Sequence, residues 1–129
     1  MSRRAVSTNA APAAVGPYSQ GILTDDLVFC AGQVGLDPAT GELVEGGLEA
    51  QTDRAIRNIE AVLDAAGCTL ADIVKTTVFL ADIADFATMN GIYGRFMPDP
   101  PPARTTFAVA ALPKGARIEI EAVAVRDRG

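Results

Sequence analysis

The chain has 129 residues, enough for one domain with a hydrophobic core and too few for two folded units. Acidic residues outnumber basic ones, 16 to 11, and the net charge is −5 at pH 7; this disfavours nucleic acid as a partner, because binding it needs a basic surface. The absence of histidine removes the commonest general base, the Ser-His and Cys-His nucleophile pairs and the usual zinc ligands. We therefore expect one domain, residues 1–129, with no metal, whose chemistry depends on carboxylate, arginine, tyrosine, hydroxyl or main-chain groups.

The sequence has no apolar run long enough to cross a bilayer, and its charged start, residues 2–4, is followed by mixed small residues and not by an apolar leader. We predict a cytoplasmic protein without membrane contact. Cys30 lies in an apolar run and Cys68 follows a glycine. In a cytosolic protein both are expected to be reduced packing residues.

The N-terminal segment, residues 1–15, is rich in alanine and has no hydrophobic period, so we interpret it as a surface arm. In the next segment, residues 16–21 (GPYSQG), glycine and proline fix a bend and place the Tyr18 hydroxyl at a defined position. A tyrosine after a turn is more often a packing residue than a catalyst. Residues 21–24 are then expected to form a short strand that ends at the turn-forming pair Asp25-Asp26.

The apolar run Leu27–Ala31 predicts a central strand covered on both faces. It ends at Gly32, where glycine either lets a ligand or another backbone approach closely or forms a β-bulge. Turn-forming residues follow at 37–41, and residues 42–44 are expected to return as a short edge strand.

Two amphipathic helices are expected. In the first, residues 49–66, apolar side chains recur at helical spacing and Gly67 supplies the C-terminal stop. A strand at residues 73–80 leads to the second helix, residues 85–97, whose stripe of large side chains is typical of a helix packed on a core: Phe86, Met89, Tyr93 and Phe96. The proline-rich residues 98–102 end this helix.

The last two strands are predicted at residues 101–109 and 117–125. In each, one face suits packing beneath a helix and the other mixes charged with small or apolar side chains. Two helices can cover only one face of a sheet of five or six strands, so we predict an α+β two-layer domain with both helices on one face of a mixed sheet. The uncovered face is expected to be buried in a homo-oligomer and to gather Arg104, Thr106, Ala108, Glu119, Val123 and Val125.

Several motifs occur together and in order: GPYSQG at residues 16–21, AGQ at 31–33, DIVKTTVFL at 72–80, PARTT at 102–106, LP at 112–113 and IEIE at 118–121. With these motifs the chain resembles, over nearly its whole length, the RidA/YjgF family of reactive-intermediate deaminases. The resemblance implies a chorismate-mutase-like α+β fold and a homotrimer with ligand clefts between neighbouring subunits. It also implies hydrolysis of 2-imino or enamine acids, such as 2-iminobutanoate and 2-iminopropanoate, to 2-keto acids and ammonia, without a cofactor.

The resemblance also implies roles for five residues. Arg104 matches the arginine that binds the substrate carboxylate, a task that suits a planar guanidinium because it can donate two parallel hydrogen bonds. Glu119 matches the carboxylate that acts on the hydrolytic water. Tyr18 and Thr106 match residues that line the substrate cleft, and the Gly32 backbone lies where the family's strand end contacts the substrate.

At one position the chain departs from the family pattern: many members carry serine before the Gly-Gln pair, and this chain has Ala31. Either the backbone alone makes the contact there, or the substrate is a different imine or enamine. Two other functions are kept as alternatives. A trimeric protein that binds or senses small acids would keep Arg104 without needing Glu119 for turnover. An RNA-cleaving translation inhibitor, an activity attached to some relatives, fits poorly with the acidic charge and the absence of histidine.

Overall fold

One mixed β-sheet organises the fold. A computed structural model describes residues 2–126, so Met1 and residues 127–129 of the predicted domain lie outside the described residues. The strand order is β1-β2-β3-β6-β4-β5; β4 and β5 run parallel, and the other neighbouring strands run antiparallel. The strands are β1 (Arg4–Val6), β2 (Gly21–Leu23), β3 (Leu27–Val34), β4 (Ile73–Leu80), β5 (Ala103–Ala108) and β6 (Ile118–Val125).

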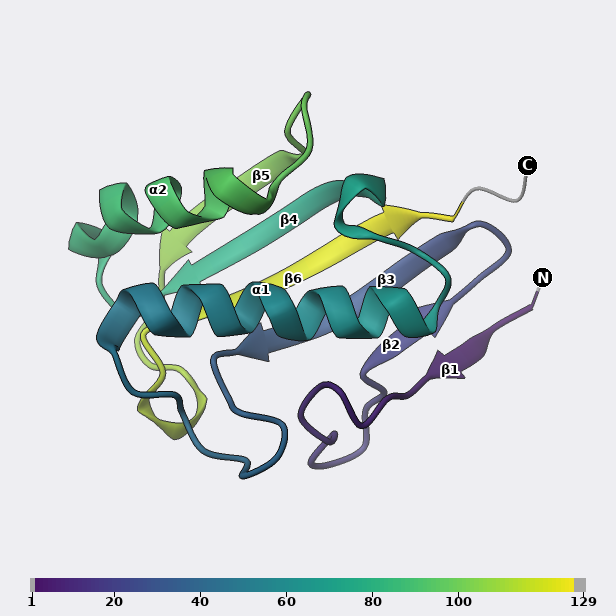
Figure 1. The fold of residues 1–129 in the computed structure, drawn as a ribbon, viewed down its shortest axis with the longest axis horizontal. Helices are drawn as coiled ribbons and strands as arrows, with labels where there is room; N and C mark the ends of the chain where they lie inside the picture. The colour runs from purple at the N-terminus through teal and green to yellow at the C-terminus, as the bar shows by residue number, and fades with distance from the viewer. Residues whose placement is uncertain (1, 127–129) are drawn as a thin grey trace.

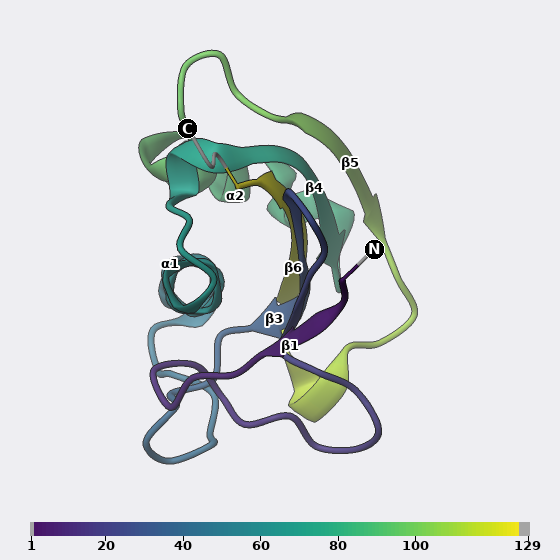
Figure 2. The same cartoon turned by 90° about the vertical axis from the view of Figure 1, so that its right-hand side faces the viewer.

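Both helices lie on the same side of this sheet, as Figure 1 and Figure 2 show. Helix α1 spans Gly47–Ala65 and α2 spans Phe86–Phe96; short 3-10 turns occur at η1 (Leu70–Asp72), η2 (Ile83–Asp85) and η3 (Pro113–Gly115). The predicted α+β domain, with two helices on one face of a mixed sheet, is confirmed. Among residues 2–126, neither helix combines the length and hydropathy that crossing a bilayer requires.

The hydrophobic core lies between α1 and the central strands β3 and β6. Ile56 and Leu63 of α1 are fully buried in one cluster with Val28 of β3 and Ile118 of β6. Full burial of such a side chain is worth about 1.5–3 kcal/mol. Gly67 has a φ of +83° and ends α1 as predicted, because glycine adopts the left-handed region without steric cost.

Helix α2 lies over β4 and β5, the parallel pair that it connects (Figure 1). Just before its first residue, Nη2 of Arg117 donates to both carboxylate oxygens of Asp85, at 3.0 and 3.1 Å. Near its end, the Tyr93 hydroxyl and the Thr76 hydroxyl of β4 share a hydrogen bond of 2.7 Å. These contacts fix both ends of α2 on the sheet beside β5.

The side chains of β5 face the opposite sides of the sheet from those predicted. Arg104 pairs with Thr76 in the β4–β5 register, and Thr76 is buried beneath α2. Arg104, and Thr106 two residues further on, therefore lie on the helix-covered side. Glu119 lies on the open side, because its neighbours in β6 point into the core. The expectation that six residues share the uncovered face is wrong for Arg104, Thr106 and Ala108, whose partners in β4 are buried. It is right for the three β6 residues, Glu119, Val123 and Val125, which alternate with core residues.

Other segments differ in smaller ways. Within the predicted N-terminal arm, Arg4–Val6 forms the edge strand β1. Residues 42–44 do not form the expected strand, and a single bridge joins Leu36 to Leu43. Strand β3 is central as predicted, but its outer face is uncovered within the chain, where Phe29 is 44% exposed.

Candidate active site

Arg104 of β5 is half-buried and faces α2. Its guanidinium carbon lies 4.9 Å from the centre of the Tyr93 ring and 5.5 Å from that of Phe86. Its Nη1 points to the Met89 sulfur at 3.9 Å. Among residues 2–126, no carboxylate lies within the 4.0 Å that would make an ion pair with Arg104. The arginine therefore has uncharged neighbours and keeps donor groups for an anion from outside the chain.

Two buried polar atoms on the same side of the sheet have no hydrogen-bond partner among residues 2–126: Oγ1 of Thr106 and Oδ1 of Asn90. A buried polar atom left without a partner costs about 1–3 kcal/mol, so such atoms often mark places where a ligand binds. Asn90 follows Met89 on α2 and was not among the predicted residues. Its place between Phe86 and Tyr93, at helical spacing, was the available signal.

Tyr18, Gly32 and Glu119 line a cavity of about 620 Å³ on the open side of the sheet. Tyr18 is 52% exposed, and its hydroxyl accepts a hydrogen bond from the Val15 N–H at 3.2 Å. The cavity wall also includes Ala31, the residue at which this chain departs from the family pattern. The structure thus brings three of the five predicted site residues together.

Gly32 and Glu119 are in direct contact. A register shift between Cys30 and Gln33 marks a bulge in β3 opposite β6, and a Cβ atom at Gly32 would overlap the Glu119 carboxylate. Both interpretations of this glycine, the bulge and the close approach, therefore apply. The group that approaches the Gly32 backbone is the Glu119 side chain. Because glycine has no Cβ atom, it leaves room for that carboxylate.

Burial raises the pKa of Glu119 above its ordinary value of 4.5, and the neighbouring Glu121 carboxylate raises it further. A carboxyl group with a raised pKa exchanges its proton nearer neutral pH, which suits acid–base chemistry. Glu121 lies on the same side of β6 but is exposed. Lys114 also lines the cavity, and its ammonium donates to the Gly41 carbonyl oxygen at 2.9 Å.

Gln20 fixes one wall of the cavity and was missed by the sequence analysis. Its side chain is buried, and its Nε2 donates to the Pro12 carbonyl oxygen at 2.7 Å and to that of Thr8 at 3.0 Å. Its Oε1 accepts from the Thr8 N–H at 2.7 Å, and its own carbonyl oxygen accepts from the Ala31 N–H at 2.9 Å. Gln20 therefore links the N-terminal segment to β3, through its side chain and its backbone carbonyl respectively.

Neither cysteine is placed to act as a nucleophile. Cys30 and Cys68 are both buried and free. Burial raises the pKa of the Cys30 thiol to about 12, so the thiol stays protonated near neutral pH and is unreactive. Within residues 2–126, no three His, Cys, Asp or Glu side chains gather as a metal site would require.

The five predicted residues form two groups that do not meet within one chain. Arg104 pairs with Thr76 of β4, and Glu119 pairs with Phe79, three residues further along the same strand, which is about 10 Å. The two side chains also project from opposite sides of the sheet. The first group, Arg104 and Thr106, lies at the edge strand β5 beneath α2. The second group lines the cavity beside β3 and consists of Tyr18, Gly32 and Glu119.

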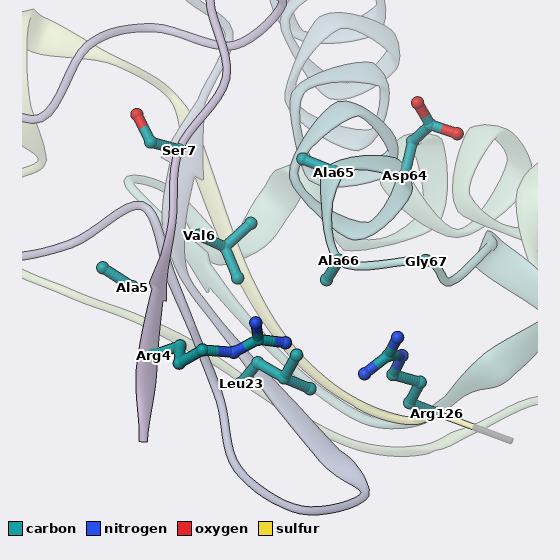
Figure 3. Close-up of a pocket in the computed structure, with 10 residues that line it drawn as sticks. All are labelled: Arg4, Ala5, Val6, Ser7, Leu23, Asp64, Ala65, Ala66, Gly67 and Arg126. Atoms are coloured by element: carbon teal, nitrogen blue, oxygen red, sulfur yellow. The ribbon is translucent and has the colours of Figure 1, made fainter. Parts of the chain in front are cut away.

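A separate cavity of about 500 Å³ lies beside the C-terminal end of α1 and contains none of these residues. Figure 3 shows the side chains of Arg4 and Arg126 reaching toward the same gap below Ala66 and Gly67, while Asp64 points away from them. The cavity is thus built separately from the two groups of predicted site residues.

Residues 8–126 match the model of the Endoribonuclease L-PSP family, and the chain therefore belongs to this family. The human protein named 2-iminobutanoate/2-iminopropanoate deaminase is 52% identical over 96% of this chain and 90% of its own length.

Solved structures of relatives have the same fold. The crystal structure of E. coli TdcF with bound serine matches with a TM-score of 0.90 at 41% identity and covers 96% of this chain and 99% of that one. The YjgF gene product from E. coli matches with a TM-score of 0.90 at 43% identity, over 96% of this chain and 99% of its own. The resemblance to the RidA/YjgF family is confirmed.

Proposed function

We propose that this protein hydrolyses short-lived 2-imino acids, or their enamine tautomers, to 2-keto acids and ammonia. The human relative that carries this activity in its name is 52% identical over 96% of the chain. The structural observation that carries the proposal is Arg104, a half-buried cation without a carboxylate partner among residues 2–126. A partly desolvated charge is costly unless an anion meets it, and a 2-imino acid brings a carboxylate.

The proposed site is completed by two copies of the chain. Arg104 and Thr106, at the free edge of one copy's sheet, lie against the neighbour's cavity lined by Tyr18, Gly32 and Glu119. This head-to-tail contact buries the apolar open face of the sheet, on which Phe29 and Phe107 are more than 40% exposed. Repeated in a closed ring, it gives equal clefts between all neighbours. The family resemblance supports three copies in this ring.

In this site Arg104 clamps the substrate carboxylate with two parallel N–H donors. Glu119 accepts a proton from water while the water oxygen bonds to the imine carbon and the C=N electron pair moves to nitrogen. The imine reacts in its protonated form, so this attack leaves a neutral amino alcohol. Glu119 then passes the proton to the amino nitrogen, the C–N bond breaks to release ammonia, and the hydroxyl proton returns to the Glu119 carboxylate as the C=O bond forms; Glu119 finally releases that proton to ammonia or solvent. The raised pKa of Glu119 favours this two-way proton transfer. The reaction consumes one water and changes no oxidation state.

Tyr18 and Thr106 hold the rest of the substrate. Thr106 brings a buried hydroxyl without a partner among residues 2–126, and Tyr18 brings a half-exposed ring at the cavity mouth. The Gly32 backbone lies against the carboxylate of Glu119, so a substrate that contacts this backbone also lies beside the catalytic group.

A small-acid binding protein is the second candidate, because the E. coli relative TdcF was crystallised with bound serine. Such a protein would bind 2-keto acids through Arg104 without turnover. RNA cleavage, which the family description names, would need an affinity that falls steeply with salt. The net charge of −5 opposes it.

The test is to generate imines in situ from several amino acids with an amino-acid oxidase and to follow keto-acid release with and without the protein. We expect release to rise in proportion to protein concentration and to return to the background rate with Glu119→Gln. Equal release with and without the protein, for every amino acid, would contradict the proposal. In that case, 2-oxobutanoate binding measured by calorimetry would identify a binding protein.

A further inference from the structure

The surroundings of Arg104 are unusual for a half-buried arginine, because they are uncharged and come from one helix. Phe86 and Tyr93 stand two turns apart on α2 and present their rings to the same guanidinium, at 5.5 and 4.9 Å. Met89, one turn from each of them, is fully buried and offers its sulfur to Nη1 at 3.9 Å. A face of α2 that the sequence indicates as plain core packing is thus a cradle for one side chain.

Ring faces hold a guanidinium in a different way from a carboxylate. They attract the cation across its plane, through the negative face of the ring, and leave the in-plane N–H groups free. A carboxylate partner would occupy the same N–H fork that a substrate needs. The cradle therefore fixes the plane of the guanidinium while its donors stay available.

The cradle is itself held rigidly. The Tyr93 hydroxyl shares a hydrogen bond of 2.7 Å with Thr76, which is fully buried, and so the side chain cannot swing away from β4 without breaking a buried contact. Burial raises the pKa of Tyr93, which keeps the phenol neutral. Tyr93 therefore does not compete as an anion with the substrate carboxylate for Arg104. At the other end of α2, the contact between Arg117 and Asp85 fixes the start of the helix beside Phe86.

We propose that Phe86 and Tyr93 are positioning residues that hold the guanidinium plane of Arg104 ready for the two-point clamp on a substrate carboxylate. This inference rests on the proposed function, because it assigns the cradle to the arginine that binds the 2-imino acid. Both residues act through Arg104 and not on the reacting atoms. Their loss therefore weakens binding of ground state and transition state alike.

The experiment compares Phe86→Leu, Tyr93→Leu and Tyr93→Phe with wild type, measuring kcat and KM for the imine and the Kd of 2-oxobutanoate, a stable keto acid with the same carboxylate. We expect both leucine variants to raise KM and Kd by at least about threefold, with kcat within about twofold of wild type. Tyr93→Phe keeps the ring face and is expected to restore most of the affinity that Tyr93→Leu loses.

Phe96→Leu is the matched control, because Phe96 is an aromatic residue of the same helix whose ring lies 4.7 Å from the guanidinium of a different arginine, Arg57. It is expected to leave KM and Kd at wild-type values whatever it does to the melting temperature. A merely structural role for the rings predicts that all the leucine variants change stability and none changes Kd.

Wild-type Kd values for folded Phe86→Leu would overturn the inference. Phe86→Leu tests the inference even if Tyr93→Leu fails to fold, because Phe86 is 38% exposed and its truncation leaves the core intact. The inference and the proposed function fail separately. A protein that binds 2-oxobutanoate through Arg104 but hydrolyses no imine refutes the function, and the Kd series still tests the cradle. A protein that hydrolyses imines with unchanged Kd in both leucine variants refutes the cradle alone.

Discussion

Arg104 keeps its guanidinium between uncharged neighbours, so the shape of this group matters as much as its charge. Arg104→Lys retains the charge but replaces the planar fork with a point charge. We expect kcat/KM for imino acids to fall at least about tenfold, with a melting temperature close to that of wild type. Steady-state kinetics and thermal denaturation check this, and near-normal turnover in the folded variant would remove Arg104 from the carboxylate-binding role.

Glu119 and Glu121 share one side of β6, and the first is half-buried while the second is exposed. Glu119→Gln keeps the shape of the side chain but cannot accept a proton, so kcat is expected to fall by about 10²–10⁴-fold with 2-oxobutanoate binding retained. Glu121→Gln is expected to stay within about twofold of wild-type turnover at neutral pH. Equal, wild-type rates for both variants would mean that neither carboxylate moves the proton. A slow Glu121→Gln alone would reverse the assignment.

The raised pKa of Glu119, caused by burial and then by Glu121, makes a prediction about stability. A carboxyl group whose pKa is higher in the folded state favours folding when it is protonated; this contribution is complete below the unfolded-state pKa and is lost as the pH rises through the folded-state value. We therefore expect the stability of Glu119→Gln relative to wild type to increase as the pH rises above the ordinary glutamate pKa of about 4.3. Urea denaturation at a series of pH values measures the difference, and a difference that does not change with pH would show that burial does not strain this carboxylate.

At the scale of the elements, the bulge of β3 and strand β6 are fitted to each other at Gly32. Its backbone is not in the left-handed region, so Gly32→Ala is expected to change stability little. The new Cβ would still displace the Glu119 carboxylate, and turnover should fall to the level of Glu119→Gln. Combining the two substitutions should cause no further loss, because both remove the same group.

Gly94→Ala on α2 is the control for that prediction. Gly94 is exposed, and no atom lies within 4 Å of the place its Cβ would take. The substitution is expected to stabilise the helix by about 0.5–1 kcal/mol without changing kcat. Additive losses of turnover in the Gly32→Ala and Glu119→Gln double variant would contradict the prediction, because they would show that Gly32 acts independently of the Glu119 carboxylate.

The sequence predicted both helices and five of the six strands, but it missed β1, predicted a strand at residues 42–44 that does not form, and did not show which side of the sheet each β5 side chain faces. The alternation that buries Ile118 and Ile120 and turns Glu119 outward follows from residue type alone, and the structure confirms it. Strand β5 does not touch β6, since β4 lies between them and α2 leads into β5. Its register depends on that connection, and a shift by one residue turns every side chain to the other side. Residues 105–108 alternate too weakly in polarity to decide the matter.

The amides of Gln20 and Asn90 show a second limit of the sequence. Both are polar residue types that usually face solvent. Helical spacing places Asn90 near Phe86 and Tyr93, but it does not show that the amide oxygen is buried without a partner, and nothing in the spacing of Gln20 marks it as buried. Their roles depend on what the folded backbone brings near them. Gln20 meets carbonyl groups of the N-terminal segment, and the Oδ1 atom of Asn90 meets no partner among residues 2–126.

At the scale of the whole molecule, the separation of Arg104 from Glu119 predicts that inactive variants can rescue each other. Arg104→Lys and Glu119→Gln should each form trimers by light scattering and each have low activity. In a mixed ring of three, one contact joins an intact Arg104 to an intact Glu119, so random mixing after refolding restores roughly a quarter of the clefts. Activity that stays at the sum of the separate variants, or a monomer at micromolar concentration, would contradict the shared site.

The position of the two groups on opposite sides of one sheet also means that the proposed shared site would tie catalysis to protein concentration. A chain whose catalytic groups all met within one fold would keep its turnover number on dilution, however far its oligomer dissociated. In the proposed shared site, a solitary chain would have a clamp without a base on one side and a base without a clamp on the other. We therefore expect its turnover number to fall on dilution with the fraction of chains that have neighbours, so that the association constant of the ring would set the expression level below which activity is lost.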